Sequence, residues 1–258
     1  MPFPLFHGYV YSKRSPKNIA YSMLPDFLGM VNASLWDKMH NRPKVQEYVL
    51  QNGSNPALDG ILDHLNVDDI MNYNIHTSKG ILFPIKKELA QELRTSFRIT
   101  GKFLSDLSEV IIEFSLDQIL AEKHKFYDEF EKALKGINPQ ETAEYLHGFL
   151  KRSRRKIRRY VLELKTIQPR ELLTLEGVVS FARRRYGFNL TSILEIGKNV
   201  KSTSLRGVLR NVRLIHKLLH DPMYFERLKE IQQRYKERID KKFKVLLLAF
   251  EDGNRKRN

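Results

Sequence analysis

Apolar residues recur at the three- and four-residue spacing of helix faces along most of this chain, whereas the alternation typical of strands is scarce. Between residues 18 and 40, for example, the apolar positions are Ile19, Met23, Phe27, Met30, Val31 and Leu35. Similar segments cover residues 55–73, 103–120, 142–164, 170–186, 190–198 and 204–250. We therefore expect an all-α protein, a single multi-helix bundle-like domain with a basic helical C-terminal half.

Turn-forming residues separate the predicted helices. The breaks are expected at Arg42-Pro43, Asn52–Pro56, Lys79-Gly80 with Pro84, Gly136–Pro139 and Gln168-Pro169. Pro25 and Pro222 are expected to interrupt two helices, because an internal proline removes a backbone hydrogen bond. Asn55 is a predicted N-cap, and any extension of the helix that starts near residue 103 should end at Gly136.

The composition excludes several classes of protein. Of 258 residues, 41% are hydrophobic and 29% are charged, which is typical of a globular protein with a large core. No apolar run approaches the roughly 20 residues that span a bilayer. The first residues lack the basic start and long apolar stretch of a signal peptide, so we expect a cytoplasmic protein. Because cysteine is absent, any metal must be held by His, Asp, Glu and water.

The formal net charge of +15 is unevenly distributed. Residues 1–150 carry 16 Lys and Arg against 19 Asp and Glu, whereas residues 151–258 carry 29 against 11. We predict a helical metal-centre region over 1–150 and a basic helical region over 151–258 packed on it. The basic excess favours an anionic phosphate-containing substrate, a nucleic acid or an anionic lipid surface as partner, although a solubilising, ion-paired surface has the same composition. The oligomeric state stays open.

His64 and Asp68 lie four residues apart in an apolar helical stretch, which places an imidazole and a carboxylate on one helix face. Glu113 and Asp117 repeat this spacing. A carboxylate buried among apolar side chains is costly unless it is paired, protonated or bound to a metal. A salt-bridged helix face, or an arginine across the core, would also explain such pairs.

Three more residues with metal-ligand chemistry precede this pair. His7 follows Pro-Leu-Phe, Asp26 follows Leu-Pro, and His40 ends a helix before Asn-Arg-Pro. Helical bundles build metal sites from oxygen and nitrogen ligands on several helices, and two metals about 4 Å apart can hold a phosphate ester and activate water. Each residue taken alone also has a structural explanation, such as a hydrogen-bonded histidine or, for Asp26, a helix cap.

The order Pro-x-Pro-Leu-x-His7, Leu-Pro-Asp26, a helix-ending His40 and Gly-Ile-Leu-x-His64-Leu-x-x-Asp68 resembles the zinc-dependent phospholipase C family and its intracellular relatives. It is also similar to single-strand nucleases and, more loosely, to acyl carrier protein phosphodiesterases. The likeness rests on short motifs within about the first 120 residues. It implies a helical, metal-centred hydrolase of phosphate esters. The metal ligands that it implies are His7, Asp26, His40, His64, Asp68, Glu113 and Asp117, of which Asp68 and Glu113 are also catalytic candidates.

Two features depart from that family. Secreted members use a processed N-terminal residue as a ligand, whereas this chain begins with Met1. Many relatives carry a histidine one helical turn after the helix aspartate, where this chain has Asn72, a weaker ligand. His76 could replace it if the helix continues. We therefore expect a divalent metal, with zinc as the first choice and manganese, iron or magnesium as alternatives.

The segment Lys151–Tyr160 carries basic side chains on two helical stripes. One stripe is Arg152, Lys156 and Arg159, and the other is Arg154, Arg155 and Arg158. We name Arg154, Arg155 and Arg158 as candidate anion-binding residues, with a merely solvated face as the alternative. The segment 183–188 adds aromatic rings beside cations, which suits single-stranded nucleic acid or an ordinary helix end.

Two functional hypotheses follow. In the first, the chain is a metal-dependent phosphodiesterase or phospholipase C-like hydrolase, and its activity is lost on chelation. In the second, it is a non-catalytic basic helical protein that binds nucleic acid or an anionic membrane surface, and this binding weakens steeply with salt. Glycine-rich phosphate loops, nucleophile elbows and kinase motifs are absent from the sequence.

Overall fold

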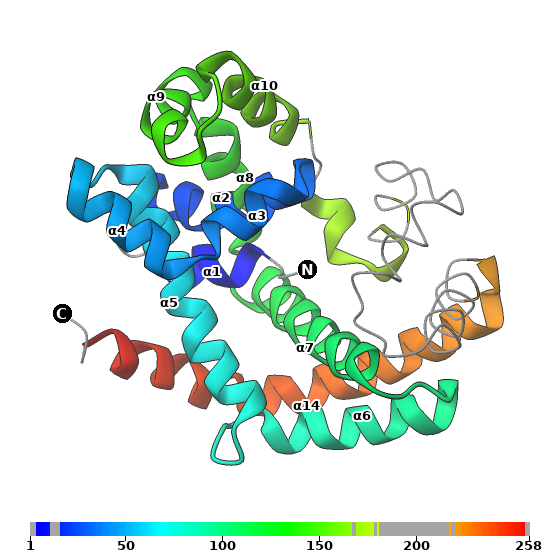
Figure 1. The fold of residues 1–258 in the computed structure, drawn as a ribbon. Coiled ribbons are helices and arrows are strands. Elements are labelled where there is room, and N and C mark those ends of the chain that lie inside the picture. The colour runs from blue at the N-terminus through cyan, green and yellow to red at the C-terminus, as the bar shows by residue number, and fades with distance from the viewer. Residues whose placement is uncertain are drawn as a thin grey trace. The chain divides into compact units, whose positions relative to one another are not determined.

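The computed structural model describes residues 4–10, 16–166, 169–177, 180, 217 and 220–255. These residues form helices and no strand, which confirms the predicted all-α, bundle-like fold (Figure 1). Within the same residues, no helix combines the length and the apolar character needed to cross a bilayer. The helix expected over 190–198, most of the one expected over 204–220, and residues 178–179 and 181–186 of the one expected over 170–186 lie outside the described residues.

The described helices group into two compact units. They are α1 (Pro4–Val10), α2 (Pro16–Val31), α3 (Ala33–Met39), α4 (Arg42–Asn52), α5 (Pro56–His76), α6 (Phe83–Phe97), α7 (Lys102–Lys123), α8 (Tyr127–Gly136), α9 (Pro139–Leu150), α10 (Arg154–Leu164), the 3-10 helix η1 (Pro169–Leu173) and α14 (Pro222–Arg255). The first unit takes its residues from 1–73, 117–168 and 245–258, and the second from 74–116 and 169–244. The division predicted from the sequence, into a metal-centre region over 1–150 and a basic region over 151–258, stays a prediction.

Several predicted helix ends are confirmed, and the caps explain them. The Asn55 side chain accepts hydrogen bonds from the backbone N–H groups of Ala57 and Leu58, at 3.1 and 3.0 Å, so α5 begins where its N-cap was expected. His40 is the C-cap of α3. α8 ends at Gly136, and Pro139 opens α9.

Other expectations about the helices are wrong. The helix expected over 142–164 is divided into α9 and α10 at Lys151, whose φ is +51°. The extension of α7 towards residue 134 is a separate helix, α8, which follows Lys125 with φ +49°. Pro84, which the sequence pattern assigns to a connection, lies in the first turn of α6, where a missing N–H costs nothing.

In the first unit, α2 contacts α1, α3, α8 and α10 (Figure 1). Its side chains Met23, Leu24, Phe27 and Leu28 are fully buried. Pro25 lies inside α2 and does not divide it, contrary to expectation. It cannot donate a hydrogen bond to the carbonyl of residue 21, so the ladder of α2 is open at this turn.

α5 approaches α2 at that same turn. A Cβ atom added to Gly60 of α5 would lie 2.4 Å from the Tyr21 Cβ atom and 2.6 Å from its backbone carbonyl carbon. Only glycine permits this approach without displacing one of the helices. The close approach matters for the site, because His64 lies one turn further along α5.

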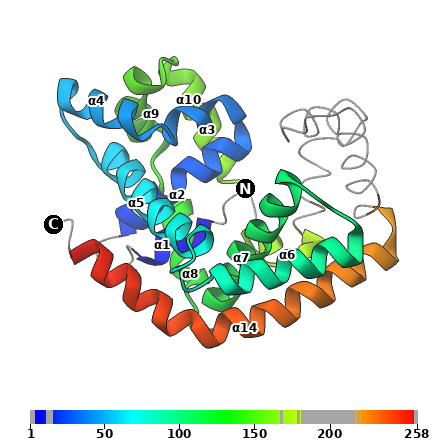
Figure 2. The same ribbon diagram turned by 60° about the horizontal axis from the view of Figure 1, so that its bottom comes forward.

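In the second unit, α6 and the part of α14 before residue 245 run side by side in both views (Figures 1 and 2). Arg234 of α14 forms an ion pair with Glu92 of α6. Gln232 donates a hydrogen bond of 3.1 Å to the hydroxyl of Ser115 on α7. Buried apolar residues of α6 recur at four-residue spacing, at Ile85, Leu89, Leu93 and Phe97.

Candidate metal centre

Five predicted ligands converge within the first unit. His7 comes from α1, Asp26 from α2, His40 from the end of α3, and His64 with Asp68 from α5. The Nε2 atom of His64 lies 3.6 Å from Asp26 Oδ1 and 3.3 Å from Asp68 Oδ2. His40 Nε2 lies 3.7 Å from Asp26 Oδ1, and His7 Nε2 lies 3.5 Å from Asp68 Oδ1. Residues that are up to 61 positions apart in the chain therefore share one small volume.

Two backbone carbonyls fix the tautomers of two of these histidines. His64 Nδ1 lies 2.9 Å from the Ser22 carbonyl oxygen, and His40 Nδ1 lies 2.9 Å from that of Trp36. Because a carbonyl oxygen can only accept, each Nδ1 must carry the hydrogen. In each neutral ring, the lone pair is then on Nε2, which is the orientation that metal-binding histidines usually have.

The two Nε2 atoms face each other at 3.0 Å. With both rings neutral, two lone pairs would point at one another between the carboxylates of Asp26 and Asp68. Such an arrangement is favourable only when a proton or another cation lies between the lone pairs. The histidines are therefore preorganised around a position for a positive charge.

Burial of the cluster strengthens its requirement for a compensating positive charge. The side chains of Asp26 and His64 are fully buried, and that of His7 is 5% exposed. Both carboxylate oxygens of Asp26 and Nδ1 of His7 lack a hydrogen-bond partner within the part of the chain that the structure describes. A buried carboxylate without donors is costly, and a cation offsets that cost directly.

One side of the cluster is open to solvent. The side chains of Asp68 and His40 are 24% and 10% exposed. The indole of Trp36, which is 40% exposed, stacks on the His40 ring with the centroids 4.1 Å apart. Asp68, His40 and Trp36 are therefore the side chains through which the cluster contacts solvent.

The pKa values show how strongly the cluster holds a positive charge. Burial lowers the pKa of His64, but the charges of Asp26 and Asp68 outweigh burial and raise it to about 9. Burial and the neighbouring His64 lower the pKa of His7 to about 4. His64 lowers the pKa of Asp68 despite burial. A metal ion would compete with the proton that His64 otherwise carries.

The ligand atoms form two overlapping triads. His7, His64 and Asp68 form one, and Asp26, His40 and His64 the other, with the ligand atoms of each triad within 4.8 Å of one another. His64 belongs to both triads. Because its Nδ1 is hydrogen-bonded to the Ser22 carbonyl, its Nε2 is the ligand atom available to both triads. The cluster therefore positions His and Asp groups to hold a metal ion. Imidazole and carboxylate ligands suit zinc, manganese and iron.

Asp117 has a clear structural role beside this cluster. Its two carboxylate oxygens accept hydrogen bonds from the backbone N–H groups of Leu5 and Phe6, at 3.2 and 2.8 Å. These bonds hold the start of α1, which places His7. Burial raises the pKa of Asp117 well above its usual range, and the charge of Asp26 raises it further. A ligand role for Asp117 stays a prediction.

Glu113 and His76 lie in the second unit. Glu113 is half-buried on α7, where its charge acts on Lys86, and it is in neither ligand triad. Both ring nitrogens of His76 have partners there, since Nε2 lies 3.2 Å from Glu109 and Nδ1 lies 3.0 Å from Lys86. The catalytic and ligand roles predicted for Glu113 remain predictions.

The three candidate anion-binding arginines differ in their surroundings. Arg154 Nε lies 2.6 Å from the carboxylate of Glu144, so a neighbour on α9 compensates its charge. Arg155 and Arg158 line a surface pocket on α10.

The sequence analysis did not identify the backbone carbonyls of Ser22 and Trp36 as hydrogen-bond partners of His64 and His40. The Trp36 carbonyl is one helical turn before His40 and could have been inferred, but that of Ser22 reaches His64 only through packing.

No family model, curated protein or solved structure matches this chain. The likeness to the zinc-dependent phospholipase C family therefore rests on the sequence motifs alone. The geometry of the His and Asp cluster is the independent observation from which function is argued.

Proposed function

We propose that this protein is a metal-dependent hydrolase of phosphate esters, with zinc as the first-choice metal and manganese, iron or magnesium as alternatives. The proposal rests on the two facing Nε2 atoms and on the adjacent Asp26 carboxylate, which accepts no hydrogen bond from the described residues. Three imidazoles and two carboxylates give the ligand types of a hydrolytic zinc or manganese site. An open side distinguishes catalytic sites from closed structural ones.

The residues have different tasks in this proposal. Asp26, fully buried, supplies compensating charge, while the carbonyls of Ser22 and Trp36 hold the His64 and His40 rings in the ligating tautomer. A metal ion held by these residues would supply Lewis acidity for activating water and polarising a phosphoryl oxygen. Asp68, at the open side, is the carboxylate that accepts a proton from the attacking water.

The proposal is tested with a chromogenic phosphodiester, bis(p-nitrophenyl) phosphate. We expect hydrolysis by protein loaded with zinc or manganese, loss of the rate on chelation, and recovery when metal is returned. Asp68→Asn should retain the fold and lose most of the rate. A protein that holds about one metal per chain and hydrolyses neither this compound nor other phosphodiesters would contradict the hydrolase and leave the metal centre intact.

A pH dependence follows from the two shifted histidines in the metal-free protein. The folded pKa of His64 is raised to about 9, so its contribution to stability is complete below about pH 6.5 and is lost as pH rises through 9. The folded pKa of His7 is lowered to about 4, so its contribution is lost as pH falls from 6.5 through 4. Each shift corresponds to roughly 3 kcal/mol.

We therefore expect the free energy of unfolding of metal-free protein to decrease from pH 6.5 towards pH 9. Zinc should remove that decrease, because the ion replaces the His64 proton. Urea denaturation at pH 5, 6.5, 8 and 9, with and without zinc, measures both effects. The His64→Ala variant should lack the decrease, and a wild-type stability that is constant from pH 6.5 to 9 without metal would contradict the prediction.

A further inference from the structure

α10 has two sharply different sides. Ile157, Tyr160, Val161 and Leu164 are buried, and the helix packs on α9 and α2. The Tyr160 hydroxyl accepts a hydrogen bond of 3.0 Å from Asn32 at the start of α3. The apolar side is therefore fixed in the core of the first unit, which leaves the basic side chains of α10 exposed to solvent.

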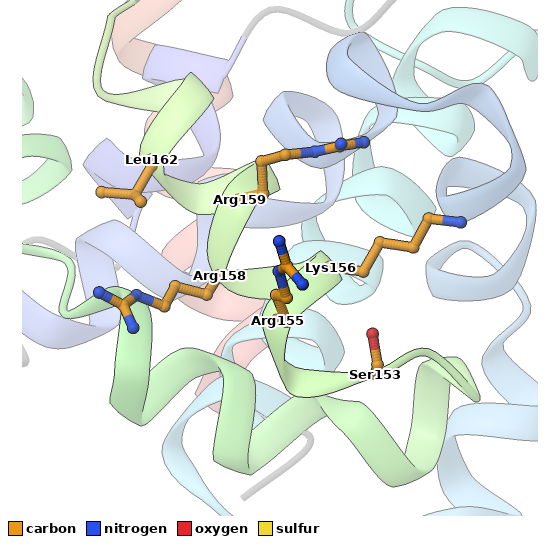
Figure 3. A pocket seen from close by; sticks show the side chains of 6 residues that line it. All are labelled: Ser153, Arg155, Lys156, Arg158, Arg159 and Leu162. Atoms are coloured by element: carbon orange, nitrogen blue, oxygen red, sulfur yellow. The ribbon is translucent and has the colours of Figure 1, made fainter.

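These basic side chains line a pocket. Its volume is about 460 Å³, and its lining residues are Ser153, Arg155, Lys156, Arg158, Arg159 and Leu162 (Figure 3). Figure 3 shows Arg155 in the middle, with Arg158 extending to one side and Lys156 and Arg159 to the other. This volume lies within the range of roughly 300–1,000 Å³ that small-molecule sites occupy.

None of the described residues that line the pocket carries a carboxylate. Arg154, the one candidate with an acidic partner, pairs with Glu144 and is not among the lining residues. The four lining cations form no ion pair with any residue in the described ranges. Four like charges around one pocket produce a positive potential that a bound anion neutralises.

More positive charge lies next to the start of α10. Lys38 of α3 donates a hydrogen bond of 2.7 Å to the carbonyl of Leu150. Burial lowers the pKa of Lys38, and the charges of Arg152 and Lys151 lower it further. The cationic surface therefore extends beyond the pocket towards α3.

We propose that this pocket, the α10 anion site, binds a multiply charged phosphate-bearing ligand at a place distinct from the metal centre. Three guanidinium groups offer paired donors that match phosphate oxygens, and the Ser153 hydroxyl, which makes no capping hydrogen bond, adds another donor. The described lining residues include no aromatic ring on which the bases of a single-stranded nucleic acid could stack, which favours a small anion as the ligand. The α10 anion site shares no residue with the His and Asp cluster and does not depend on the proposed hydrolase function.

The direct test is calorimetric titration of the full chain with inorganic tripolyphosphate at 0.15 M salt. The Arg155→Gln/Arg158→Gln variant should bind about tenfold more weakly, since each exposed charge contact is worth up to about fivefold in affinity. The matched control, Lys241→Gln/Lys242→Gln, removes the same charge from exposed positions on α14 and should bind within about twofold of wild type. Equal weakening in both variants would overturn the site, because binding would then follow net charge alone.

Two further measurements identify where the anion binds and where it comes from. Binding lost in His64→Ala/Asp68→Ala, yet kept in Arg155→Gln/Arg158→Gln, would place the anion at the metal centre and overturn the proposal. Vesicles with anionic headgroups that bind wild type and are displaced by tripolyphosphate would make a lipid the source of the phosphate. Tripolyphosphate binding without vesicle binding would indicate a soluble ligand. A single-stranded oligonucleotide that binds much more tightly than either probe, through the same arginines, would contradict a small-anion site.

Discussion

The double variant His64→Ala/Asp68→Ala is expected to lose its bound metal ion. His64 supplies a ligand atom to both triads, and Asp68 supplies one to the triad that also contains His7. Partners outside the ligand sphere already change metal affinity by about 10- to 100-fold, so the loss of two ligands should weaken binding by more than about a hundredfold. Elemental analysis of protein purified without added metal, followed by zinc titration, measures the loss.

The matched control for this variant is His76→Ala. His76 lies on the same helix, but its ring contacts Glu109 and Lys86 in the second unit. It should keep the wild-type metal content, and its circular dichroism should be unchanged. Wild-type protein without metal, or a double variant that keeps it, would refute the metal centre. Loss of metal in His76→Ala alone would instead show that the ligands lie elsewhere.

A large loss of stability is expected from Gly60→Ala. The added methyl group would lie 2.4 Å from the Tyr21 Cβ atom and 2.6 Å from the backbone of α2, which cannot move aside as a flexible side chain can. Overpacking of this kind typically costs about 1–3 kcal/mol, more than the roughly 1 kcal/mol that alanine gains over glycine in a helix. Because the contact is as short as 2.4 Å, we expect a net loss of about 1–2 kcal/mol after that gain is subtracted, measured by urea denaturation.

Gly136→Ala is the matched control for this substitution. Gly136 is the last residue of α8, and a Cβ atom there would have no neighbour within 4 Å. The same change should therefore be neutral or stabilising by up to about 1 kcal/mol. Gly60→Ala should also weaken zinc binding, because shifting α5 draws His64 away from the Ser22 carbonyl. Equal stability of the two variants would refute the close approach of α5 and α2.

Sequence patterns located the helices better than their ends. Asn55, Gly136 and Pro139 acted as expected because capping and helix-stopping chemistry is local. The breaks at Lys125 and Lys151 were missed because lysine adopts a positive φ there, and no glycine or asparagine marks the turn. Those two conformations depend on packing around the turns, which spacing along the chain does not reveal.

Local sequence patterns were also sufficient to predict most of the candidate site. Helical spacing placed His64 and Asp68 on one face, and the motif order suggested His7, Asp26 and His40. Spacing along the chain could not predict which hydrogen-bond or ion-pair partners the candidate residues have in the folded protein. The hydrogen bonds from Leu5 and Phe6 to Asp117, and the ion pair of Arg154 with Glu144, join segments that only tertiary packing brings together.

The stacking of Trp36 on His40 gives the metal centre an optical signal of its own. Trp36 is the only tryptophan in the chain, so indole emission originates from a single ring, whose plane is inclined by 22° to that of a candidate ligand. Coordination of that imidazole to a paramagnetic ion such as cobalt alters the emission of a stacked indole. Occupancy of the cluster can thus be followed spectroscopically in the unlabelled protein.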